Sequence, residues 1–120
     1  MDVSPEAKEK IGQLQLFEQN LHSFLQQKQS FQTQILEIDN ALKELEGAQD
    51  PVYKIVGSVM VRADKKGLTK DLTERKDVLD LRLKSVEKQE KAIKEKAEKI
   101  QAEVMEEIEK RMKKDHGRAH

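Results

Sequence analysis

The sequence predicts a mainly α protein in which two long helices fold back on each other as an antiparallel coiled coil around a central β-hairpin. Two stretches carry apolar residues spaced by three and four, and a short run rich in β-branched residues separates them. Aromatic residues make up only 3% of the 120 residues. So few large side chains suit a narrow interface between helices better than a broad globular core. We expect one domain over residues 1–120.

The first helix is expected over about residues 5–46. Ser4 is a candidate N-cap, Pro5 suits the first turn, and Gly47 marks the end. Two interleaved heptad series run between these signals, and their only polar member is Lys28. We call these positions, with those of the second helix, the seam. In the first helix the seam consists of Leu14, Phe17, Leu21, Phe24, Lys28, Phe31, Ile35, Ile38, Leu42 and Leu45.

Residues 52–63 have the composition of two short strands, and Gly57-Ser58 supplies the turn of a hairpin. An isolated hairpin is barely stable in water, and the rest of the chain has nothing spare to cover it. We therefore expect other chains to cover it. The predicted oligomerisation residues are Val52, Tyr53, Ile55, Val56, Gly57, Val59, Met60 and Val61.

The second helix is expected over about residues 69–113, with residues 64–67 as a turn and Thr69 as the N-cap. Beyond the regular seam the apolar spacing changes to Ile108 and Met112, which indicates a stutter. Residues 114–120 are expected to form a frayed tail. In the second helix the seam consists of Leu72, Lys76, Leu79, Leu83, Val86, Glu90, Ile93, Ala97, Ile100 and Val104.

The register of the two helices is left open by the pattern. Facing residues have numbers that add to roughly 114 or roughly 121 in an antiparallel pair with this seam. In either register Lys28 and Glu90 lie in adjacent layers. They either meet across the interface and help to set the register, or extend separately to solvent.

Antiparallel folding brings the start of the first helix and the end of the second to one tip. Charged residues there occupy positions that would continue the seam, so some apolar groups should face solvent or a partner. The alternatives are a surface for non-native chains and ordinary closure of the coil end. The predicted tip residues are Val3, Ala7, Ile11, Met105, Ile108 and Met112.

Composition and motifs argue against several classes of function. Lys plus Arg and Asp plus Glu both number 23, which gives no net basic character for nucleic acid or a membrane surface. No apolar run reaches the roughly 20 residues of a membrane span, no signal peptide is recognisable, and cysteine is absent. We therefore expect a cytoplasmic protein.

Residues for catalysis or cofactor binding are also lacking in the sequence. It has no phosphate-binding loop, dinucleotide fingerprint or zinc-protease motif. His22 lies off the seam, where solvation is the simpler interpretation, and His116 and His120 belong to the tail, where a weak metal site is the alternative. We expect no enzyme, no metal site and no cofactor.

The segment Asp50-Pro51-Val52-Tyr53-Lys54-Ile55-Val56-Gly57-Ser58-Val59-Met60-Val61, followed by Asp64-Lys65-Lys66, resembles the β-type subunits of archaeal prefoldin and their eukaryotic subunit-six relatives. The resemblance covers nearly the whole chain, and one hairpin rather than two indicates the β type. It implies a hexamer of two α-type and four β-type subunits, whose hairpins form a β-barrel platform. It also implies coiled-coil tips that hold unfolded proteins without ATP and pass them to a group II chaperonin. The alternatives are a structural coiled-coil adaptor for one specific protein and a regulatory subunit of an enzyme.

Overall fold

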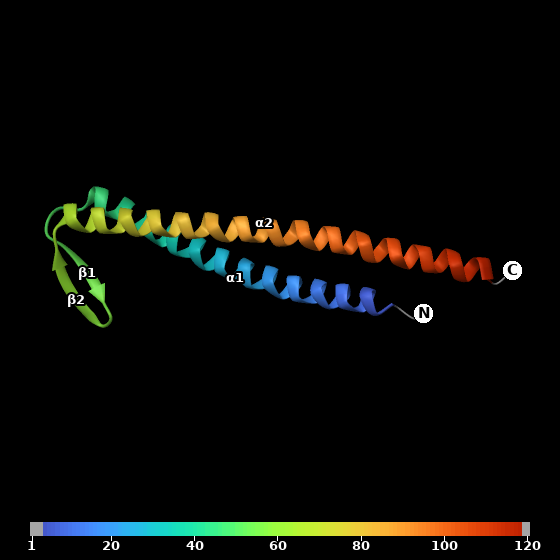
Figure 1. Cartoon of the computed structure of the whole chain (residues 1–120). Coiled ribbons are helices and arrows are strands. Elements are labelled where there is room, and N and C mark those ends of the chain that lie inside the picture. Colours follow the sequence, from blue (N-terminus) through green and yellow to red (C-terminus); the bar gives the residue numbers. More distant parts are fainter. Residues whose placement is uncertain (1–3, 119–120) are drawn as a thin grey trace. The chain divides into compact units, whose positions relative to one another are not determined.

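A computed structural model describes the backbone of residues 4–118 and the side chains of residues 4–114. Its elements follow the order α1 (Pro5–Gly47), β1 (Val52–Val56), β2 (Val59–Ala63) and α2 (Lys65–Arg118) (Figure 1). The predicted mainly α fold, with two long helices and a hairpin, is confirmed. Residue contacts divide the chain into two compact units, which we describe separately. Unit 1 holds the described residues up to Gln26 and from Glu87 onwards, and unit 2 holds Gln27–Val86.

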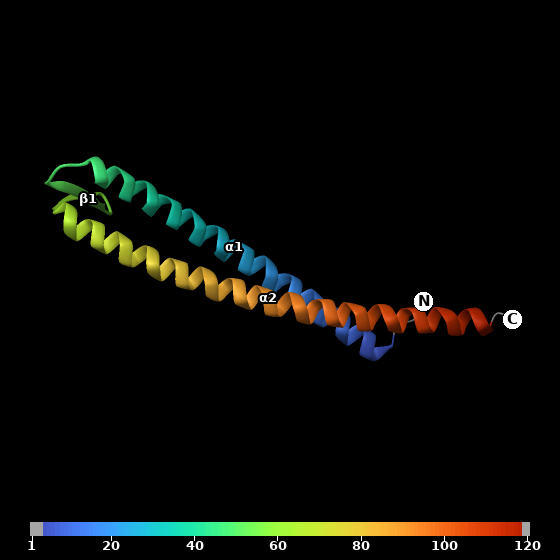
Figure 2. The same ribbon diagram turned by 90° about the horizontal axis from the view of Figure 1, so that it is seen from above.

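Unit 2 contains the second half of α1, the hairpin and the first part of α2. Its helical segments run side by side in opposite directions (Figure 2), and Lys76 Nζ lies 2.6 Å from Asp39 Oδ1 between them. The predicted seam is confirmed here, because each of its positions is buried or half-buried. The most buried apolar side chains of this unit are Ile38, Leu45, Val52, Leu79 and Val86.

Unit 1 pairs the first half of α1 with the rest of α2. The seam positions are again half-buried or buried, and Ala7 and Val104 are the apolar residues with the least exposure. Lys10 Nζ lies 3.2 Å from Glu103 Oε2 across the helix pair. No helix of the described part of the chain is long and apolar enough to cross a membrane.

The ion pairs decide the register in each unit. Lys10–Glu103 in unit 1 and Asp39–Lys76 in unit 2 both fit facing residue numbers that add to roughly 114, and neither fits the alternative near 121. Lys28 and Glu90 belong to different units, and their pairing stays a prediction.

The hairpin has the boundaries that the sequence predicts. Its strands are antiparallel, with Val52 opposite Ala63 and Val56 opposite Val59. Gly57 has φ of 62°, in the left-handed region, and it is the first of two turn residues. Such a turn matches the right-handed twist of the flanking strands, and glycine adopts this φ without steric cost.

The start of α2 differs from the prediction. The helix begins at Lys65 rather than near Thr69, because the Asp64 carboxylate accepts a hydrogen bond from the Gly67 amide at 2.8 Å and so acts as the N-cap. The hydroxyl of Thr69 is already inside the helix and donates to the carbonyl of Lys65. A lysine pair before a glycine looks like a turn in sequence, yet the acidic residue before it can start a helix.

The end of α2 also differs. The helix continues to Arg118, past the expected limit near residue 113, so residues 114–118 are helical and not the start of the frayed tail that we expected over residues 114–120. Strong helix formers follow one another as far as Lys114 and carry the helix beyond the expected limit. The stutter expected after Val104 is only partly present: Ile108 is half-buried, but Met112 is exposed. Glu107 and Arg111, which continue the heptads, are half-buried instead.

Candidate functional site

The hairpin exposes apolar side chains on both of its faces. Neighbouring residues of a strand point to opposite faces, and directly opposed residues share a face. Ile55 and Met60 oppose each other on one face and are 73% and 68% exposed. Val56 and Val59 oppose each other on the other face and are also exposed. Only Val52, at the base of the hairpin, is buried. Two opposite faces of this kind cannot both be covered by the helices of one chain.

Both long edges of the hairpin are without a strand neighbour in the described part of the chain. The sheet has two strands, in the order β1-β2. Each outer edge therefore presents backbone N–H and C=O groups with no partner strand, which is a template for pairing with another chain. Exposed apolar faces and free edges together make the hairpin a candidate assembly surface.

The base of the hairpin is fixed to both helices by polar contacts. The Lys65 backbone amide donates to Asp50 Oδ1 at 2.6 Å, and Lys65 Nζ donates to the Glu46 carbonyl at 3.2 Å. One residue at the start of α2 thereby connects the end of α1 and the strand entry. Because basic residues in the first turn of a helix are unfavourable, the carboxylates of Asp50 and Asp64 also offset the charge of Lys65 and Lys66.

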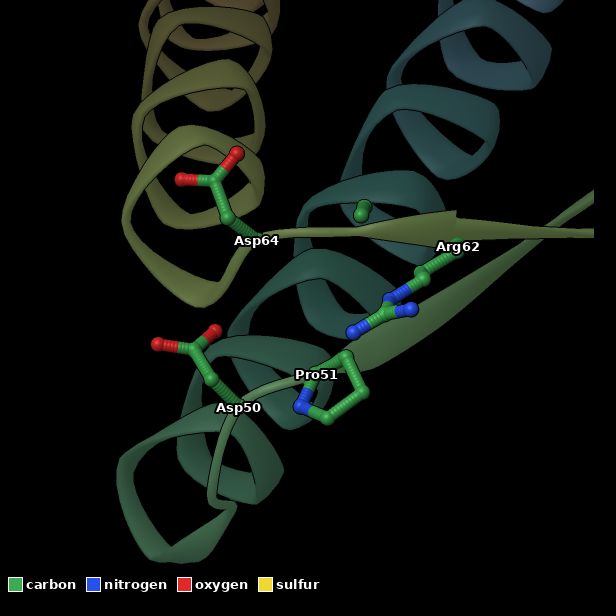
Figure 3. Close-up of a pocket in the computed structure, with 5 residues that line it drawn as sticks. Asp50, Pro51, Arg62 and Asp64 are labelled. Atoms are coloured by element: carbon green, nitrogen blue, oxygen red, sulfur yellow. The ribbon is translucent and has the colours of Figure 1, made fainter.

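A shallow pocket of about 460 Å³ opens at this base. Figure 3 shows the guanidinium of Arg62 directed toward the ring of Pro51, while the carboxylates of Asp50 and Asp64 point away from Arg62. Asp50 and Asp64 already accept backbone hydrogen bonds there. We therefore interpret the pocket as part of the structural junction between the hairpin and α2.

A larger groove of about 600 Å³ lies between the hairpin base and the helices of unit 2. Its walls are mostly apolar, and they combine the last turns of α1 with the first turns of α2. The groove continues the exposed surface of the hairpin through Tyr53, which is itself exposed. Its lining consists of Ala41, Glu44, Leu45, Ala48, Gln49, Pro51, Val52, Tyr53, Leu68 and Leu72.

The tip residues in unit 1 are unequal in exposure. Met105 and Met112 are both 53% exposed, Ile11 and Ile108 are half-buried, and Ala7 is fully buried. Val3 lies outside the described residues. Flexible, polarisable methionine side chains suit contacts with varied apolar partners. The two methionines on α2 therefore form most of the accessible apolar surface among the described tip residues.

Ser4 ties the start of α1 to α2. Its Oγ accepts a hydrogen bond from the Ala7 amide at 3.0 Å, so Ser4 is the N-cap that the sequence predicts. The same hydroxyl donates to the Glu107 carboxylate. Glu107 Oε1 also lies 4.0 Å from Nε of Arg111, one turn further along α2. Past this contact α2 continues to Arg118.

The described side chains include no group of three or more His, Cys, Asp or Glu residues that could hold a metal ion. His22 is exposed and lies 3.2 Å from the Gln26 amide nitrogen on its own helix. A hydrogen bond to Asp39 is the main cause of a raised pKa at Lys76. That contact is part of the helix pairing of unit 2.

Comparison with known proteins decides the family. Residues 8–111 match the family described as "Prefoldin subunit". The chain belongs to this prefoldin subunit family. Membership places it among the subunits of prefoldin chaperone assemblies.

Prefoldin relatives are similar along almost all of the chain. The prefoldin subunit beta of Methanospirillum hungatei is 35% identical over 116 residues, which cover 95% of this chain and 97% of that protein. The corresponding subunit of Methanothrix thermoacetophila is 38% identical over 102 residues, which cover 83% and 85% of the two chains. The predicted resemblance to β-type prefoldin subunits is thus confirmed.

A solved prefoldin structure agrees with the fold as well. The crystal structure of the prefoldin beta subunit from Thermococcus strain KS-1 superposes with a TM-score of 0.80 at 34% identity. The match covers 88% of this chain and 94% of that one. Two long helices joined by one hairpin are therefore shared with a β-type prefoldin subunit.

Sequence reasoning missed two contacts that shape these surfaces. The carboxylate of Asp50 caps α2 from fifteen positions away, and Glu107 accepts from Ser4 at the opposite end of the chain. Asp50 precedes a proline and looks like a helix stop, while Glu107 looks like one more solvated charge. In the register in which facing residue numbers add to roughly 114, however, Glu107 lies close to the start of α1. That position was the signal from which a contact with Ser4 could have been predicted.

Proposed function

We propose that this chain is the β-type subunit of an ATP-independent chaperone, a holdase that captures non-native polypeptides at its tip. The observation that carries the proposal is the pair of exposed methionines, Met105 and Met112, at the end of a prefoldin-type helix pair. Folded proteins hide their apolar groups, whereas unfolded chains display them. A small apolar surface therefore distinguishes clients from native proteins without reading their sequence.

Assembly is proposed to occur through the hairpins. Ile55, Val56, Val59 and Met60 are exposed in the single chain and would be covered in a platform of β-barrels built from several subunits. The expected assembly is a hexamer of two α-type and four β-type subunits. The same cover extends to Val61, which is exposed, and to Tyr53 beside the groove.

Capture then depends on multivalency. Each tip offers a small apolar surface, so each contact is weak, but several tips on one platform raise the effective concentration of the next contact. A competing partner displaces such contacts one at a time, which allows transfer without ATP. We propose that the recipient is a group II chaperonin in the cytoplasm, and that the subunit needs no cofactor and catalyses no reaction.

The test is a deletion of the tip. A variant without residues 1–10 and 105–120 loses both exposed methionines and keeps the hairpin, so its assembly with the α-type partner should persist in analytical ultracentrifugation. It should lose the ability to suppress aggregation of citrate synthase diluted from guanidinium. A matched control with Met105→Leu and Met112→Leu keeps apolar side chains at both exposed positions and should still protect.

Equal protection by the deletion variant and the full chain would contradict tip binding and move client contact elsewhere on the molecule. Protection of one particular protein, with none for unrelated denatured proteins, would instead favour a structural adaptor.

A further inference from the structure

The hydroxyl of Ser4 serves two structural purposes at once. It accepts the Ala7 amide proton as the N-cap of α1, and it donates its own proton to the carboxylate of Glu107 on α2. Ser4 is 6% exposed, and it is the only buried polar residue among the described ones. A group this buried and this connected is a constraint on the end of α1.

Beneath this contact lies apolar surface that the closed tip hides. Ala7 has no exposed surface, and Val104 is 6% exposed. Ile11 and Ile108 flank them and are half-buried. If the first turns of α1 moved away from α2, these four side chains would join Met105 and Met112 at the surface.

Both side chains of the Ser4–Glu107 contact keep another partner when the contact breaks. Ser4 remains the cap of α1, since its acceptor function toward Ala7 does not depend on α2. Glu107 keeps Arg111, one turn away on its own helix. Opening therefore leaves no buried charge unpaired, which is the usual large cost of breaking a polar contact. Two satisfied arrangements are what a two-state element requires.

We propose that the Ser4–Glu107 contact is a latch that sets how much apolar surface the tip offers to a non-native chain. The closed latch leaves mainly Met105 and Met112 accessible, and the open latch adds Ala7, Val104 and their neighbours. This proposal rests on the proposed function of the tip and adds a regulating residue pair to it. A client with a long apolar stretch would favour the open state, because it binds that state better.

The variant Ser4→Asp separates the latch from the cap. Aspartate caps a helix about as well as serine, so α1 keeps its N-cap. Aspartate cannot donate to Glu107 when ionised, and it repels that carboxylate. The double variant Ser4→Asp/Glu107→Gln restores a donor, because the glutamine amide can donate to the new carboxylate. Gln13→Glu is the matched control: it adds the same charge at an exposed position of α1.

Two measurements are made on the full chain assembled with its α-type partner. Amide hydrogen exchange in residues 6–11 reports opening without any client. Suppression of citrate synthase aggregation reports capture. In Ser4→Asp, exchange should accelerate and half-protection should need about threefold less chaperone, because the tip contact is strengthened in every copy. The double variant and Gln13→Glu should both behave like the unmodified chain.

The outcomes are distinguishable. Unchanged exchange in Ser4→Asp would overturn the latch, since the contact would not hold α1 in place. Faster exchange with unchanged protection would also overturn it, and the proposed function would stand if deletion of the tip still abolished protection. If deletion of the tip had no effect, the proposed function itself would fall, and the latch with it.

Discussion

The hairpin and the helical seam of unit 2 contain the same kinds of side chain in opposite environments. Ile38 and Leu79 in the seam are 7% and 5% exposed, whereas Ile55 and Met60 in the hairpin are largely open to solvent. The apolar seam residues of each helix are covered by the facing helix of the same chain. The hairpin has two apolar faces and two free edges, and the helices bury only its base at Val52.

This difference separates the part of the chain that covers its own apolar surface from the part that needs other chains to cover it. A coiled coil needs one partner helix for each apolar stripe, and folding back supplies it. A two-stranded sheet needs cover on each apolar face and a neighbour at each edge, and one short chain does not supply these. Membership of a family of chaperone subunits agrees with this division of the molecule into a self-sufficient part and a dependent part.

The largest effect is expected when the apolar faces of the hairpin are changed. Replacing Ile55 and Val59 with aspartate places charges on both faces, where neighbouring chains are expected to pack. Mixtures with the α-type partner should then fall from the assembled mass to that of small species in analytical ultracentrifugation. Helicity by circular dichroism should be unchanged, because the seam is untouched. The control Ser58→Asp adds a charge in the turn, and it should assemble normally.

An unchanged assembly mass for the Ile55→Asp/Val59→Asp variant would mean that the apolar faces of the hairpin are not the contact surface. Assembly would then have to use the edges alone or the helices.

A smaller but sharper contrast lies within α2. Leu79 is 5% exposed in the seam, and Leu81, two residues later, is 68% exposed. Leu79→Ala should lower the free energy of unfolding by about 2–4 kcal/mol, through lost burial and the cavity that remains. Leu81→Ala should change it by less than about 0.5 kcal/mol. Urea unfolding at one protein concentration measures both. Similar losses at the two positions would show that the outer face of α2 is also covered.

Much of this division was visible in the sequence. Spacing by three and four marked the seam, and every predicted seam residue of unit 2 is buried or half-buried, including the polar Lys76. The strands were also predicted with their observed limits, since Gly57-Ser58 leaves little freedom in placing the turn. Periodicity and turn chemistry are local, so a single sequence suffices to read them.

What the sequence left open depends on contacts between distant residues. Two registers satisfied the same seam, and only the Lys10–Glu103 and Asp39–Lys76 pairs distinguish them. The start of α2 was placed late because Lys65-Lys66-Gly67 resembles a turn, while the stabilising groups include Asp50 from before the hairpin. Ala7 shows the same limit at the tip, where its burial depends on how closely α1 approaches α2.

The smallest expected effect concerns the polar interruption of the seam at Lys76. A hydrogen bond to Asp39 raises the pKa of Lys76 above its ordinary value of 10.5, and the charges of Asp39, Asp80 and Asp77 act in the same direction, while desolvation opposes them. A lysine whose pKa is raised on folding stabilises the folded state below its unfolded pKa. That contribution is lost as the pH rises through the higher folded pKa.

The stability of the unmodified chain should therefore fall more steeply as the pH rises through and above 10.5 than that of Asp39→Asn, which removes the main cause of the shift. The urea midpoint at each pH measures this difference, and taking the difference cancels the titration of the other lysines. Asp71→Asn, at an exposed position of α2, serves as the control and should follow the unmodified chain. Both side chains of the pair are partly exposed, so solvent screening keeps the effect small. Parallel pH profiles for the unmodified chain and Asp39→Asn would show that the contact with Asp39 fixes the register geometrically and contributes nothing measurable through charge.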